Sequence, residues 1–210
     1  MKRISVLAVG LLLHVSASAE AHRLDEYLQA TRLDISRNRV VVELDLTPGV
    51  LVASQIFATI DSDGDGRVSP TEIEDYARRV LRDLSLRVDD RPCALTLTRA
   101  ESPSWDEIRD GEGTIHLEAF ADTPLARGVH RIRYANMHES ASGVFLVNAL
   151  KPSTDALVIR AQRRDVQQRV IDLDVDVGTS FDAATWWVIP IAGLGALLMR
   201  RRRTPTASSP

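Results

Sequence analysis

The chain has 210 residues, enough for one ordinary domain with accessory segments. A composition of 44% hydrophobic and 26% charged residues is typical of a globular protein and argues against a largely disordered one. The formal net charge of −3 argues against a nucleic-acid partner, because phosphate backbones are bound by basic surfaces. The single cysteine, Cys93, cannot form an internal disulfide, so we expect a small core residue, with pairing between chains as the alternative.

Residues 1–21 are typical of a secretory signal peptide. Two basic residues precede an apolar run, Ile4 to Val15, which is too short to cross a bilayer comfortably. Small residues follow, and cleavage after Ala19 or after Ala21 would satisfy the usual rule. An uncleaved anchor is the alternative. We therefore expect residues 22–178 to form an extracytoplasmic domain.

Most of that domain shows the short alternating apolar runs of β-strands. Their spacing predicts a mainly β fold, an immunoglobulin-like sandwich of about seven to nine strands. The polar stretch 101–113, which contains Trp105, Asp106 and Glu107, is expected to be a surface loop. The predicted strands are Tyr27–Ile35, Val40–Leu46, Leu84–Val88, Ala94–Thr98, Thr114–Phe120, Val129–Tyr134, Val144–Leu150, Ala156–Ala161 and Val170–Val177.

One region, residues 48–84, has helical rather than strand periodicity. Thr47-Pro48 predicts the start of a first helix over 48–60, since proline is favoured at the first helical position. A second helix is predicted over 70–84, and its apolar residues recur on one face. The simplest organisation is a helix–loop–helix inserted after the second strand.

The loop between these helices, Asp61 to Glu72, has the pattern of the twelve-residue EF-hand calcium loop. Calcium is a hard cation that takes oxygen ligands, and the pattern supplies carboxylates at positions 1, 3, 5 and 12 and a glycine, Gly66, at position 6 for the sharp turn. The predicted cofactor is therefore Ca²⁺. The predicted ligands are Asp61, Asp63, Asp65, Arg67 through its backbone carbonyl, Ser69 and Glu72.

The hand has no second copy in the sequence, although EF-hands usually pair. We expect a weak structural site, with a dissociation constant of about 10⁻⁴ to 10⁻³ M as in extracellular modules. Val68, at position 8, would face a second loop in a paired hand, so a homodimer could strengthen binding. Ser69 to Glu72 also matches a helix-capping box, and Glu72 therefore has two roles available, as cap and as metal ligand.

A second apolar stretch, residues 183–199, predicts one transmembrane helix. Two tryptophans lie near its start, and Arg200 to Arg203 follow it directly. The positive-inside rule keeps the basic tail, 200–210, in the cytoplasm. We expect a chain anchored in the bacterial inner membrane with its domain in the periplasm or at the cell exterior. A processed C-terminal sorting tail is the alternative.

Four features occur in order: Ala21-His22-Arg23-Leu24, a strand hairpin, the Asp63 to Ser69 part of the hand, and Leu86 to Pro92. In this combination the chain resembles the extracytoplasmic N-terminal domain of nickel/cobalt transporter-like membrane proteins, over roughly residues 21–100. The resemblance implies an accessory role in metal transport, with a transporter as partner. Those transporters have several membrane helices after this domain. One predicted helix cannot line a transport path, so the resemblance implies a stand-alone accessory domain.

Other metal and catalytic candidates are weaker. His22, as a new N-terminus, could chelate Cu²⁺ or Ni²⁺ through its amine and imidazole. His116 and His130 fall in predicted strands with no ligand spacing, and His138-Glu139-Ser140 are sequence neighbours, which rarely form a catalytic triad. The sequence favours a calcium-binding interaction module over an accessory protein for transition-metal transport and over an extracytoplasmic hydrolase, and no enzyme is predicted.

Overall fold

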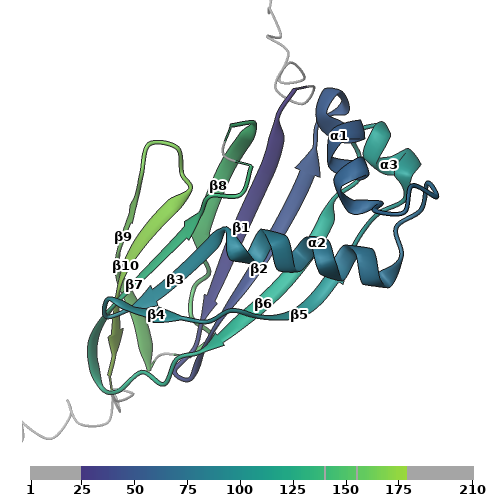
Figure 1. The fold of residues 1–210 in the computed structure, drawn as a ribbon. Helices are drawn as coiled ribbons and strands as arrows, with labels where there is room; N and C mark the ends of the chain where they lie inside the picture. Colours follow the sequence, from purple (N-terminus) through teal and green to yellow (C-terminus); the bar gives the residue numbers. More distant parts are fainter. Residues whose placement is uncertain (1–24, 140, 155, 179–210) are drawn as a thin grey trace, which may run out of the picture.

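The computed structural model describes residues 25–139, 141–154 and 156–178, which form two five-stranded sheets and three helices (Figure 1). The first, sheet A, has the spatial order β5 (Thr96–Glu101), β6 (Ile115–Asp122), β2 (Arg39–Pro48), β1 (Tyr27–Ile35) and β8 (Gly143–Ala149). The second, sheet B, has the order β4 (Arg91–Cys93), β3 (Leu84–Val88), β7 (Gly128–Asn136), β10 (Val170–Val177) and β9 (Leu157–Arg164).

Strict alternation of side chains gives each sheet one buried face. In β2, Val40, Val42, Leu44 and Leu46 are almost fully buried, and the residues between them are not. The same period of two recurs in β1, β6 and β10. Because successive side chains of a strand point to opposite faces, these residues form one core between the two sheets. The prediction of a mainly β, two-sheet fold is confirmed.

Sheet A combines a local pairing with a distant one. β1 pairs antiparallel with β2 in register Tyr27↔Pro48 to Ile35↔Val40, closing a short hairpin. On its other side β1 pairs in parallel with β8, in register Tyr27↔Gly143. All the other strand pairings within the two sheets are antiparallel.

Two helices, α1 (Val50–Ile60) and α2 (Pro70–Arg82), lie between β2 and β3 in the chain. The helix–loop–helix predicted after the second strand is therefore confirmed. The buried face of α2, made by Ile73, Tyr76, Ala77 and Val80, joins the sandwich core. Figure 1 shows α2 lying across the strands, with α1 and α3 (Trp105–Arg109) next to each other near one end of sheet A.

Three sequence predictions are corrected. The fold has ten strands in the described residues rather than seven to nine, because the single strand expected at Ala94–Thr98 is instead the pair β4 and β5. The first helix begins at Val50, since Pro48 still belongs to β2 and Gly49 is the N-cap. The expected loop around Trp105 contains α3, which Ser104 and Glu107 stabilise as a reciprocal capping box.

No helix within the described residues is long and apolar enough to span a bilayer. The predicted signal peptide at 1–21, the membrane helix at 183–199 and the basic tail at 200–210 all lie outside the described residues.

Candidate metal site

The predicted calcium loop starts where α1 ends. Asp61 is the C-cap of α1, and its backbone N–H donates to the carbonyl of Phe57 at 2.8 Å. Carboxylate oxygens of Asp61, Asp63 and Asp65 all lie within 4.8 Å of one another. These three residues, predicted as ligands from their spacing, are therefore brought together as a cluster that could hold a metal ion.

Backbone N–H groups hold the loop in this shape. Asp61 accepts hydrogen bonds from Gly64 and Gly66 at 2.9 Å, and Asp65 accepts one from Arg67 at 2.8 Å. Gly64 and Gly66 have φ of 73° and 82°, in the left-handed region that costs glycine least. The carboxylates that a cation would use thus also fold the loop around themselves.

Glu72, at the last loop position, is a buried residue inside a complete capping box. One of its oxygens, Oε2, accepts from the Ser69 N–H at 2.8 Å, and the Ser69 hydroxyl accepts from the Glu72 N–H. The other, Oε1, accepts from the N–H groups of Ser62 at 2.7 Å and Asp63 at 3.3 Å. The carboxylate therefore bridges the start of the loop to its end.

These contacts stabilise the ionised form of Glu72. The backbone hydrogen bond from Ser69, followed by the Ser69 side chain, lowers the pKa of Glu72 to about 2. Desolvation opposes this shift, and the backbone and side chain of Ser62 lower the pKa by smaller amounts. The group is therefore a carboxylate at neutral pH, the form that calcium requires.

The structure does not bring the other predicted ligand positions into the aspartate cluster. Arg67 and Ser69 are both exposed. Val68 is half-buried and packs against both clusters of the core, including the small cluster of Ala53, Phe57 and Ile108. The residue that would face a second loop in a paired hand is thus covered within this chain.

The exit helix carries a buried polar network that the sequence did not reveal. The hydroxyl of Tyr76, on α2, lies 2.6 Å from the Tyr27 hydroxyl on β1 and 3.2 Å from Nε2 of His138. Nδ1 of His138 lies 2.8 Å from Asp83, the C-cap of α2. Burial raises the pKa of Tyr76 to about 12, so its hydroxyl keeps its proton. The network therefore ties α2 to β1 and to the segment after β7.

A second set of contacts extends this network into the core. Gln29 donates to the His138 carbonyl at 2.8 Å, and Asn136 donates to the Gln29 side-chain oxygen at 2.9 Å. Asn136 in turn accepts from the His138 N–H at 2.9 Å. These bonds join the end of β7 and the residues after it to β1. The sequence feature that could have indicated this buried network is a polar residue, Gln29, at an inward-facing position of a predicted strand.

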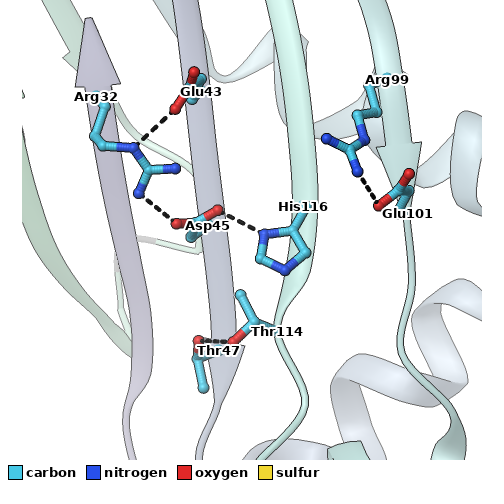
Figure 2. A network of polar contacts seen from close by, with 8 residues as sticks. All are labelled: Arg32, Glu43, Asp45, Thr47, Arg99, Glu101, Thr114 and His116. Carbon is cyan, nitrogen blue, oxygen red and sulfur yellow. Dashed lines mark hydrogen bonds and ion pairs between the residues drawn. The ribbon is translucent and has the colours of Figure 1, made fainter.

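The histidines within the described residues do not converge on one site. Figure 2 shows His116 on the outer face of sheet A, its Nδ1 2.8 Å from Asp45, which also accepts from Arg32 at 2.7 Å. His130, on sheet B, lies 2.7 Å from Asp89. Each therefore has its own carboxylate partner, and His138 serves the buried network. His22 and Ser140 lie outside the described residues.

The other polar candidates have local roles. Cys93 is half-buried against the core, and its Sγ lies 3.6 Å from the Arg91 carbonyl. Asp106 pairs with Arg109 within α3, and Glu107 caps the same helix.

Comparison with known proteins gave no matching family model, no matching curated protein and no matching solved structure.

Proposed function

We propose that the chain binds Ca²⁺ through a single EF-hand formed by α1, the Asp61–Glu72 loop and α2. The observation that carries the proposal is the convergence of the Asp61, Asp63 and Asp65 carboxylates within 4.8 Å in a loop between two helices. Oxygen ligands of this kind suit hard cations such as calcium rather than nitrogen- or sulfur-seeking metals. The full ligand set would add the Arg67 carbonyl, Ser69 and Glu72.

In this proposal Glu72 exchanges partners when calcium binds. Its two oxygens now accept backbone N–H groups at both ends of the loop, and a bidentate bond to the ion would replace some of these contacts. Glu72 is not among the carboxylates that lie within 4.8 Å of one another, so binding the ion would have to bring its side chain closer to the three aspartates. Calcium would also relieve the repulsion among the clustered carboxylates and stabilise the fold by mass action.

Calorimetric titration of the chelator-treated full chain in detergent with Ca²⁺ tests the site. We expect saturable binding to one site, weakened more than about tenfold by Glu72→Gln, because the ligand charge count sets affinity. The matched control is Glu107→Gln. This substitution removes the equivalent capping carboxylate of α3, which lies outside the loop. Absence of binding at millimolar calcium, in chain shown to be folded, would contradict the proposal.

We further propose that the domain is an immunoglobulin-like sandwich, exported and anchored in the inner membrane by the helix at 183–199, where it serves as an interaction module. Two sheets packed through alternating inner faces, antiparallel except for the β1–β8 pair, support the fold assignment. The location rests on the sequence pattern at the two ends. The resemblance to transporter accessory domains supports a membrane metal transporter as a partner, beside a second copy of this chain.

The location is tested by adding protease to spheroplasts, because only a domain outside the inner membrane would be digested.

A further inference from the structure

The outer face of sheet B carries a depression of about 470 Å³ whose charged lining comes from four strands and one turn. Its arginines are Arg87 on β3, Arg131 and Arg133 on β7, and Arg163 on β9. All four are exposed, because each occupies an outward position of its strand. Because Asp90, Asp172 and Asp174 share the lining, the four arginines leave it one positive charge in excess, in a chain of net charge −3.

Two aspartates of β10 each bond one of these arginines. Both oxygens of Asp172 accept from Arg133, at 3.0 and 2.8 Å. Both oxygens of Asp174 accept from Arg163, each at 2.8 Å. Arg131 lies opposite Asp174 in the strand register but acts on that carboxylate only through space.

Arg87 and Arg131 are consequently left without a carboxylate bonded to them in the part of the chain that the structure describes. Arg87 donates only to the backbone carbonyl of Asp90, and the Arg131 guanidinium makes no hydrogen bond there. Arg87 also lies directly opposite Arg133 in the β3–β7 register. Like charges at directly opposed positions destabilise a sheet. An anion between the three guanidinium groups would remove that repulsion.

The chemistry of the lining indicates which anion. Guanidinium groups bind tetrahedral oxyanions through pairs of parallel hydrogen bonds. Asp90 lines the same depression, and an ionised carboxylate can only accept hydrogen bonds. It would repel an oxyanion without a hydroxyl, such as sulfate, and accept a hydrogen bond from one that keeps a hydroxyl, such as monohydrogen phosphate.

We propose that this depression binds a phosphate group, held by Arg87, Arg131 and Arg133, with Asp90 selecting the protonated oxyanion. The site is independent of the calcium loop, and its ligand is either free phosphate or the phosphate of a lipid headgroup.

Nuclear magnetic resonance of the ¹⁵N-labelled full chain in detergent micelles can test this, using the Nε–Hε signals of the arginine side chains. Inorganic phosphate, added at constant ionic strength, should shift the Arg87 and Arg131 signals saturably, and sulfate should bind more than about tenfold more weakly. A short-chain phosphatidic acid, titrated separately, distinguishes the two sources. Tighter binding of the lipid assigns the headgroup, and tighter binding of inorganic phosphate assigns the free ion.

The variants separate binding from general charge effects. Arg87→Gln combined with Arg131→Gln should abolish the saturable shift of the remaining arginine signals. Arg160→Gln is the matched control, because Arg160 is an exposed arginine of the same sheet that pairs with Asp176 outside the depression. Asp90→Asn should bring phosphate and sulfate affinities together. Linear shifts without saturation, equal binding of sulfate by the unmodified chain, or unchanged binding in the double variant with a folded amide spectrum would each overturn the proposal.

Discussion

At the scale of single residues, the hydrogen bonds of the Glu72 carboxylate hold the two ends of the Asp61–Glu72 loop together. It accepts from both ends of the loop, and its pKa is lowered to about 2, chiefly by the Ser69 N–H. A group whose pKa is depressed in the folded state contributes stability above its unfolded pKa and loses it as the pH falls.

The pH dependence of stability therefore provides a prediction for Glu72. In calcium-free chain, its contribution should be complete above about pH 4.5 and lost as the pH falls through about 2, the range between the two pKa values. Glu72→Gln should remove this part of the acid sensitivity. Urea unfolding across that pH range measures it, and identical pH profiles for the variant and the parent chain would contradict it.

A second prediction at this scale concerns the Tyr76 hydroxyl, which contacts both Tyr27 and His138. Tyr76→Phe leaves these buried groups with one partner fewer, so we expect it to lower the free energy of unfolding by about 1–3 kcal/mol. Tyr134→Phe is the control, because the Tyr134 hydroxyl has a single bond, to Thr31 at 3.2 Å. Denaturant unfolding of both variants should show the larger loss for Tyr76→Phe.

At the scale of elements, α1 and α2 are both held by contacts outside the loop that joins them. The buried network fixes α2, while the Phe57 ring of α1 packs on Trp105 of α3 with centroids 4.5 Å apart. In calcium sensors the two helices swing apart to expose an apolar groove. Here such a movement would break a buried polar network on one side and an aromatic contact on the other.

We therefore predict that calcium does not change the angle between α1 and α2. Spin labels at two exposed positions, Leu51 on α1 and Arg78 on α2, in a Cys93→Ser background, give the distance by pulsed electron resonance. The distance distribution should be the same with and without calcium. Trp105→Ala should broaden it by freeing α1, whereas Trp105→Phe should not. A calcium-dependent shift in the parent chain would identify a sensor instead.

The same elements show how far the sequence could be interpreted. Leu84–Val88 and Val170–Val177 were predicted with the bounds that the structure has, because alternation of apolar and polar residues defines a half-buried strand. The bounds of Tyr27–Ile35 were also predicted, although Gln29 and Thr31 interrupt the apolar pattern of its inward face. α3 was missed because five residues are too few for helical periodicity, although Ser104 and Glu107 have the spacing of a capping box.

The candidate site divides in the same way. The three aspartates follow from local spacing, and the structure brings them together. The bonds of Tyr76 and His138 join residues 62 positions apart, and those of Gln29 and Asn136 join residues 107 apart. Periodicity and motif spacing are local properties, so such partners appear only once the sheets are assembled.

At the scale of the whole molecule, the two sides of the sandwich where the edge strands lie are covered by different contacts. On one side α2 contacts both β5 of sheet A and β3 of sheet B. On the other, Arg164 of β9 donates to the carbonyl of Val147 on β8 at 2.7 Å and to the Asn148 side chain at 2.7 Å. An unprotected edge strand can pair with another chain. By bonding the Val147 carbonyl, Arg164 occupies an acceptor on the free edge of β8 that such a chain would use.

Arg164→Gln should therefore loosen this side. We expect a loss of about 1–3 kcal/mol of unfolding free energy, as for hydrogen bonds from a charged donor, and faster amide exchange in β8. Arg160→Gln is the control, since its partner Asp176 belongs to the same sheet. Hydrogen-exchange mass spectrometry measures the effect, and equal exchange of β8 in the two variants would contradict it.

The parallel pairing of β1 with β8 has a consequence for how the chain reaches this fold. The first strand must wait for residues 143–149 before its second neighbour exists, so a large loop has to close late. Folds dominated by such distant pairings form in about milliseconds to seconds, far more slowly than helical hairpins. The β1–β2 hairpin and the helix pair at 50–82 can form early, because their contacts are local. The other edge of β1 then has unpaired backbone groups until β8 pairs with it. During folding, the pairing of β1 with β8 therefore competes with the pairing of β1 with a strand of a neighbouring chain. A low concentration of unfolded chain and slow release of chain into the refolding solution favour the native pairing.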